Sequence, residues 1–209
     1  MIRVLTIERE YGSGGADIAR KLAERLGWKL WDQLMTDEIA RQMDCESRAV
    51  EEHGERQDPL YYRLFKSFLR GSYEGSINAP KLNLVDSETI LKISRRVVEH
   101  AAEKGNCVIV GRGSQQFLKN RPDTLRIFLY APREDKVRRL RARGKSEKDA
   151  EELVDTVDRE RADFIQKYFN SEWPDRPIYH SMLNTAIGNE CVANMILSLV
   201  QTYEAKCPA

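Results

Sequence analysis

Short apolar runs alternate with longer stretches of helical periodicity along the chain. Five of these runs are short and mostly apolar, which is typical of strands buried in a parallel sheet. They span residues 2–7, 28–32, 106–111, 124–131 and 179–185. Strands that alternate with helices predict one parallel sheet with helices on both of its faces.

The stretches between these runs favour helices. Residues 16–27 place their apolar side chains on one face, and Gly27 is expected to end the helix. Residues 87–105 form another amphipathic segment, which Ser87 caps and a glycine ends. The other predicted helices are residues 36–43 with Thr36 as the cap, the charged stretch 133–170, and residues 190–205.

In open parallel sheets, ligands bind outside the edge at which the strands end. That edge is predicted to collect glycines, one acid and arginines. They are Gly12–Gly15, Asp32, Gly111–Gly113, Pro132–Arg133 and Asn184–Thr185. Because these residues converge on one edge, we expect the binding site there.

Residues 8–16, EREYGSGGA, join the first strand to the first helix and are predicted to bind phosphate. Backbone N–H groups cradle phosphate where no Cβ intervenes, and the positive end of a helix adds attraction. A tight turn would also use glycine, but three glycines in four residues exceed its needs. The predicted cradle is Gly12, Ser13, Gly14, Gly15 and Ala16.

This loop departs from the P-loop pattern GxxxxGK[ST]. With Gly14 on the second glycine, Arg9 stands at the first glycine, Gly15 at the lysine and Ala16 at the hydroxyl residue. The loop therefore lacks one positive charge and the usual protein ligand of Mg²⁺, which would be held by water and nucleotide. Arg9 is the first candidate for the missing charge, and an ion pair with a neighbouring glutamate is the alternative.

Three stretches, TIEREYGSGG, VIVGRGSQQFL and VDRERADFIQKYF, together resemble the cytidylate kinase-like family of P-loop kinases. The resemblance covers nearly the whole chain. It implies a three-layer α/β fold of the nucleoside monophosphate kinase type, with five parallel strands in the order 2-3-1-4-5. The single domain would have a core of residues 1–35, 86–132 and 176–209, a helical acceptor-binding insertion at about 36–85, and a lid at about 133–170.

The resemblance also implies transfer of the γ-phosphoryl group of ATP, with Mg²⁺, to an acceptor such as CMP or dCMP. GRG at residues 111–113 is similar to the GRD of cytidylate kinases, which makes Arg112 a ligand of the acceptor phosphate. DRER is similar to their D-x-x-R, so that Asp158 would hold the ribose and Arg161 a phosphate. By the same correspondence, Asp32 lies at the hinge of the insertion and binds the acceptor.

Residues 133–148 hold eight Lys or Arg residues against three acids, which suits the predicted lid. Transfer between phosphates needs no strong base, because the acceptor oxygen is already anionic, so catalysis rests on positioning and charge neutralisation. Arg139 and Arg143 are four residues apart on one helix face and are predicted to close on the transferred group. A solvated helix face is the alternative.

The predicted insertion mixes aromatic and basic residues between Tyr61 and Tyr73. They are interpreted either as a surface that stacks on a base or as a small helical core or homodimer face. RNA binding is not expected, because the net charge of the chain is only +1 and no single-strand-binding signature is present.

Composition and cysteine spacing argue against zinc-binding, disulfide-bonded and membrane-spanning proteins. The four cysteines form no CxxC pair and no cluster with zinc spacing, which indicates reduced thiols and a cytoplasmic location. No apolar run approaches the roughly 18 residues of a membrane span, and no metal-ligating residue is predicted. Two alternatives stay open: a kinase of a hydroxyl acceptor, with Asp32 as base, and a regulatory nucleotide-binding protein without turnover.

Overall fold

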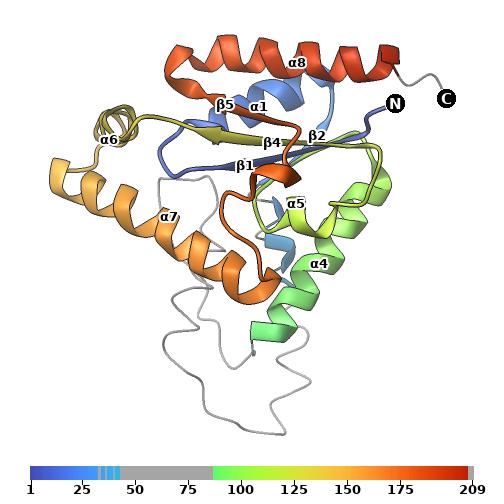
Figure 1. The fold of residues 1–209 in the computed structure, drawn as a ribbon, viewed down its shortest axis with the longest axis horizontal. Coiled ribbons are helices and arrows are strands. Elements are labelled where there is room, and N and C mark those ends of the chain that lie inside the picture. Colours follow the sequence, from blue (N-terminus) through green and yellow to red (C-terminus); the bar gives the residue numbers. More distant parts are fainter. Residues whose placement is uncertain (33, 36, 40, 43–86, 207–209) are drawn as a thin grey trace, which may run out of the picture.

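The computed structural model describes residues 1–32, 34–35, 37–39, 41–42 and 87–206. Its centre is a five-stranded parallel sheet with the strand order β2-β3-β1-β4-β5 (Figure 1). The strands are β1 (Val4–Arg9), β2 (Lys29–Trp31), β3 (Cys107–Val110), β4 (Thr124–Tyr130) and β5 (Ser181–Asn184). The predicted fold class and strand order are therefore confirmed.

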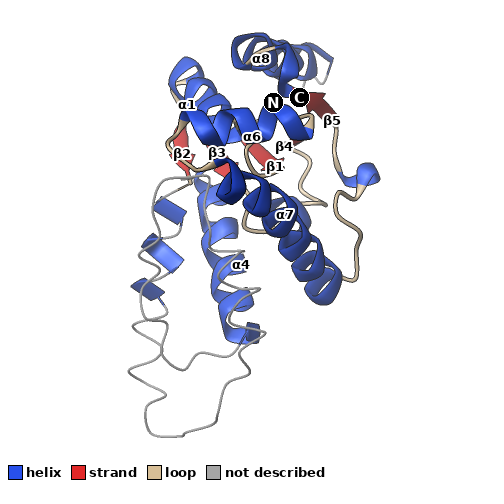
Figure 2. Ribbon diagram, turned by 90° about the vertical axis from the view of Figure 1, so that its left-hand side faces the viewer, coloured by secondary structure: helices blue, strands red, loops and turns tan. Residues whose placement is uncertain are grey.

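Helices cover both faces of the sheet, which makes three layers (Figure 1). One face carries α1 (Gly15–Leu26) and α8 (Asn189–Lys206), and the other carries α4 (Ser87–Lys104), α5 (Ser114–Phe117) and α7 (Glu147–Phe169). A further helix, α6 (Arg133–Ala142), follows the end of β4. Figure 2 shows α6 and α7 beside the ends of the central strands. Among the described residues, no helix is long and apolar enough to span a membrane.

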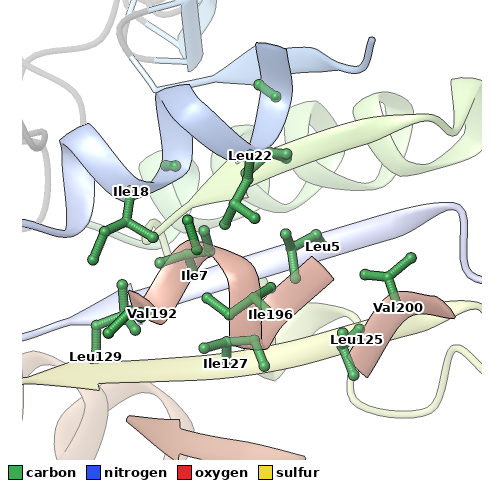
Figure 3. Close-up of a cluster of buried hydrophobic side chains, with 14 of the residues drawn as sticks. Leu5, Ile7, Ile18, Leu22, Leu125, Ile127, Leu129, Val192, Ile196 and Val200 are labelled. Carbon is green, nitrogen blue, oxygen red and sulfur yellow. The ribbon is translucent and has the colours of Figure 1, made fainter. Parts of the chain in front are cut away.

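Alternate residues of β1 enter opposite cores, because successive side chains of a strand point to opposite faces. Val4 belongs to the core beneath α4 and α7, whereas Leu5 and Ile7 pack beneath α1 and α8 (Figure 3). Full burial of one such side chain contributes about 1.5–3 kcal/mol relative to exposure. β1 is the central strand and is paired on both sides, by β3 and β4, so the residues that follow it are well anchored.

The structure refines several predicted boundaries. The charged stretch 133–170 forms two helices, α6 and α7, instead of one. Gly144, whose φ is +88°, lies between them, and the hydroxyl of Ser146 caps α7 by accepting the amide of Asp149 at 3.1 Å. Thr36 and nearly all of the predicted insertion lie outside the described residues. Leu34 and Met35 are already helical, so that helix begins before the predicted cap. The short helix α5 was not predicted.

Candidate active site

The loop between β1 and α1 has the backbone of an anion cradle. Gly12 and Gly14 have φ angles of +78° and +82°, which side-chain-bearing residues rarely adopt. Space is also limited, since a Cβ on Gly12 would lie 3.1 Å from the Cβ of Lys136, and one on Gly14 would lie 3.0 Å from Asn189 Oδ1. The first turn of α1 follows at once, so its free N–H groups face the same place as the loop. These residues fit the phosphates of a nucleotide.

The carbonyl of Ser13 fixes the far side of this loop. It accepts hydrogen bonds from Thr185 Oγ1 and Arg139 Nη1, both at 2.7 Å. Arg139 also donates to the hydroxyl and the carbonyl of Thr185, each at 2.8 Å. The hydroxyl of Ser13 donates to the carbonyl of Glu10 at 2.8 Å. Ser13 therefore contributes its backbone to the cradle, while its side chain closes the turn.

Arg9 explains why glycine stands where a P-loop has lysine. A Cβ on Gly15 would lie 2.9 Å from Cγ of Arg9, a distance that real Cβ atoms essentially never show, and 3.0 Å from its Cβ. A Cβ on Gly111 would lie 2.2 Å from Arg9 Nη1. The side chain of Arg9 thus runs past Gly15 to Gly111 and fills the space that the first carbon of a lysine would need. The missing lysine and the buried arginine are two parts of one arrangement.

Three arginines, Arg9, Arg112 and Arg161, line one small cavity that opens to solvent. These three residues are between 4% and 8% exposed. The rest of the wall is formed by Glu8, Gly113, Phe164, Ile165 and Trp173. Burial, and then the charge of Arg161, lowers the pKa of Arg9. Burial, and then the charge of Arg9, lowers the pKa of Arg112 to about 9.

Acidic groups offset part of this positive charge. Glu8, Asp32 and Asp158 each raise the pKa of Arg9, but burial and repulsion between the arginines outweigh them. The alternative ion pair foreseen for Arg9 does form, since its Nη1 lies 3.6 Å from Glu8 Oε1. The lowered pKa values of Arg9 and Arg112 show that their charges are poorly compensated, and an added anion would offset this. The arrangement therefore suits a phosphate or another small anion.

Helix α7 connects this cavity to the loop. Asp158 accepts the amide of Tyr11 at 2.8 Å and Nη1 of Arg161 at 3.2 Å. Arg161 Nη1 also donates to the carbonyl of Arg9 at 2.8 Å. Lys136 Nζ lies 3.3 Å from Asp158 Oδ2 and 2.9 Å from a carboxylate oxygen of Glu10. Burial, opposed by the charge of Arg161, raises the pKa of Asp158. Residues that face the cavity are thus bonded directly to the backbone of the cradle.

The sequence profile of the cytidylate kinase-like family matches residues 4–187. The chain belongs to the cytidylate kinase-like family. Solved structures with the same fold include an uncharacterized protein from Eubacterium ventriosum, with a TM-score of 0.67, 21% identity, and coverage of 96% of this chain and 99% of that chain. No curated protein sequence matches the chain.

Two further structures with this fold are shikimate kinases. The enzyme from Acinetobacter baumannii, in complex with shikimate, has a TM-score of 0.54, 18% identity, and coverage of 98% of this chain and 96% of its own. The enzyme from Bacteroides thetaiotaomicron has a TM-score of 0.51, 14% identity, and coverage of 96% and 99%. At these identities the likeness shows the P-loop kinase fold, and the family and the fold together make the chain a P-loop kinase.

The structure brings most of the predicted site residues of this family member together. Arg9, Arg112 and Arg161 share one cavity, and Asp158 joins it to the cradle. Asp32 directly follows β2, is partly buried, and exerts its charge on Arg112. These positions agree with the predicted roles, which themselves remain predictions.

The two arginines predicted to close on the transferred group lie elsewhere. Arg139 donates its hydrogen bonds to Ser13 and Thr185, and Arg143 Nη2 lies 2.6 Å from a carboxylate oxygen of Asp17 in α1. In this arrangement both side chains hold the loop and α1. Closing on the transferred group would require them to exchange these partners, because a guanidinium cannot satisfy both geometries at once.

Several residues of the site were not singled out from the sequence. Lys136 was hidden in a charged run, Trp173 lies in an irregular segment without periodicity, and Gln115, which donates to Glu8 at 2.8 Å, belongs to the helix that was missed. Thr185, by contrast, was expected at the ligand edge from the sequence, and it directly follows β5. Among the described residues, no group of three or more His, Cys, Asp or Glu could hold a metal.

Proposed function

We propose that this protein transfers the γ-phosphoryl group of ATP to a small phosphorylated acceptor, with CMP or dCMP as the first candidate. The observation that carries the proposal is the junction of a glycine cradle with a cavity lined by three buried arginines. Arginine is suited to both sides of such a transfer, because it stays charged and binds phosphate oxygens bidentately. The family and the fold support phosphoryl transfer, and the cavity supports an anionic acceptor.

In this proposal the glycine loop binds the donor and the arginine cavity binds the acceptor. The amides from Gly12 to Ala16 hold the donor phosphates, and Arg9 supplies the positive charge that the absent lysine would have given. Arg112 and Arg161 hold the phosphate of the acceptor, and Asp158 accepts a hydroxyl of its ribose. When bound, ATP with Mg²⁺ supplies the activated phosphoryl group and neutralises part of its charge.

Rigidity is the second contribution of the protein. Arg9 is confined between Gly15 and Gly111, and the loop is held by Thr185 and Arg139. Charges and dipoles that are already in place need no reorganisation during the transfer, which is the main source of electrostatic catalysis. We infer that Arg139 positions the cradle, whereas closure of Arg139 and Arg143 over the phosphates stays a prediction.

A screen of ATP with each nucleoside monophosphate, measured by ADP formation, tests the proposal. The expected result is acceptor-dependent ADP formation with a cytidine monophosphate, which Arg112→Met reduces mainly through a higher KM for the acceptor. Binding of ATP by calorimetry without ADP formation from any acceptor would favour a regulatory nucleotide-binding protein instead.

A kinase of a hydroxyl acceptor that carries its own anionic group is the second candidate. The specific observation is that the carboxylate of Asp32 acts on Arg112, so a base and an anion-binding group share the site. A hydroxyl must lose its proton as it attacks, whereas a phosphate oxygen has none to lose. Asp32→Asn should therefore abolish turnover with a hydroxyl acceptor and largely spare the chemical step with a monophosphate.

A further inference from the structure

The cavity of the three arginines has one wall that is neither basic nor predicted from the sequence. The indole ring of Trp173 forms this wall together with Phe164 and Ile165. Trp173 comes from the irregular segment that follows α7, twelve residues beyond Arg161 along the chain, and it lines the same cavity. The ring lies edge-on to Phe128 of β4, with centroids 5.5 Å apart and an interplanar angle of 74°.

The segment that carries Trp173 is built in place. α7 ends at Asn170, which adopts a left-handed conformation with φ of +49°. The hydroxyl of Ser171 then donates to Asp175 at 2.7 Å, and Gln116 of α5 donates to Ser171 at 3.1 Å. These bonds bracket residue 173 on both sides and fix the direction in which the ring enters the cavity wall.

The indole nitrogen of Trp173 has no hydrogen-bond partner among the described residues. Nε1 of Trp173 is buried and makes no hydrogen bond with the described residues. A buried tryptophan usually finds a partner for its N–H, because a buried donor left without one costs about 1–3 kcal/mol. The same residue therefore lines the cavity of the three arginines and carries a buried donor that has no partner among the described residues.

We propose that Trp173 is a recognition residue for the acceptor, whose indole N–H donates a hydrogen bond to an oxygen of the molecule that the arginines bind. The ligand class is a small anion that presents acceptor oxygens within the reach of both walls, such as a nucleoside monophosphate. This inference rests on the proposed function only in taking the arginine cavity as the acceptor site. It requires no transfer, so it can be tested by binding alone.

The test compares Trp173→Phe with the wild-type protein in calorimetric titrations with CMP and with inorganic phosphate. Phenylalanine keeps an aromatic ring against Phe128 and removes the N–H. A neutral hydrogen bond contributes about 0.5–1.5 kcal/mol, so Kd for CMP should rise by about two- to tenfold. If the protein turns CMP over, KM should rise by the same factor at an almost unchanged kcat, which a general structural defect would not produce.

Trp28→Phe is the matched control. Trp28 is partly buried against the opposite core, under α1 and α8, and it is not part of the cavity wall. This variant loses an indole of the same kind and should bind CMP and phosphate as the wild type does.

The two ligands separate the outcomes. Weaker binding of both ligands to Trp173→Phe places the bonded oxygen on the phosphate, and weaker binding of CMP alone places it on the remainder of the acceptor; either result supports the proposal. Unchanged affinity for both ligands overturns it. If wild-type protein binds phosphate but never forms ADP, the proposed function fails while this test still stands.

If Trp173→Phe does not fold, the wild-type protein decides the question. Its three indole N–H resonances can be followed by NMR during a phosphate or CMP titration, with Trp28→Phe and Trp31→Phe assigning two of them and thereby the third to Trp173. Formation of the hydrogen bond should move the Trp173 resonance downfield. A Trp173 resonance that stays in place at saturation would overturn the proposal.

Discussion

The steric conflict between Arg9 and position 15 can be tested by building the missing lysine into the loop. In Gly15→Lys the new Cβ would meet Arg9 at its Cγ and Cβ, at 2.9 and 3.0 Å. These atoms belong to the stem of a side chain that is only 6% exposed, so the stem cannot swing away as a free tip would. Overpacking of this kind costs about 1–3 kcal/mol.

The informative experiment is a double-mutant cycle of Gly15→Lys, Arg9→Gly and the two together. Arg9→Gly alone should also destabilise the protein, because it empties the space beside Gly15 and Gly111. The double variant restores the glycine and lysine positions of an ordinary P-loop and removes the clash. We therefore expect it to be more stable than the sum of the single effects predicts, by about 1–3 kcal/mol.

Urea unfolding of the four proteins gives the free energies of unfolding for the cycle, and ATP titrations give the functional counterpart. The double variant should recover ATP affinity that Arg9→Gly loses, because lysine and arginine supply the same charge from opposite sides of the loop. Strictly additive stability effects, or a Gly15→Lys protein as stable as the wild type, would refute the claim that the two side chains compete for one space.

Three other predictions concern the contacts around the cradle. Thr185→Val removes one hydrogen bond to the loop carbonyl and should lower stability by about 1 kcal/mol while raising KM for ATP, as measured by urea unfolding and initial rates. Asp158→Ala leaves the amide of Tyr11 without its partner, so it should weaken ATP as well as acceptor binding in separate titrations; an effect on the acceptor alone would contradict the connection through α7. Because the pKa of Arg112 is lowered to about 9, phosphate affinity should fall as pH rises from 8 to 10, and Arg112→Gln should flatten that part of the profile. Above pH 9, Arg112 binds fewer protons in the folded protein without ligand than in the unfolded chain. Its contribution to the free energy of unfolding therefore rises with pH in this range, whereas its contribution to phosphate affinity falls.

The fold could be predicted because its signals are local. Strands such as Cys107–Val110 are buried on both faces and are therefore continuously apolar, and the glycines at the ends of the helices mark where each one stops. Ligands of parallel sheets bind at the edge where the strands end, so the glycine loop, Arg112 and Thr185 could be predicted to lie together, because all three follow strands. Strand order came from the family resemblance, as periodicity alone does not fix it.

The site could be predicted only in part, because contacts between distant segments leave no local pattern. Arg139 was recognised as a basic residue of a charged helix, but its helix face is decided by how α6 meets Ser13 and Thr185. Lys136 looks like its charged neighbours in sequence, yet it packs against Gly12 and joins two carboxylates. Only the tertiary arrangement separates these two from a solvated helix face.

In the proposed site, Arg9 at the end of β1 supplies the positive charge that a lysine supplies in a P-loop, and this changes the electrostatics of the protein without ligand. A P-loop lysine begins at the first turn of the helix and reaches its phosphate along a flexible chain. Arg9 is instead held along its whole length between two glycines and beside other guanidinium groups, at a lowered pKa. In the protein without ligand, burial and mutual repulsion destabilise the charged forms of Arg9 and Arg112. The negative charge of a bound anion would offset both costs. Stabilisation by a bound anion should then be largest where Arg9 and Arg112 meet, which is the part of the site that the proposed phosphoryl transfer would use.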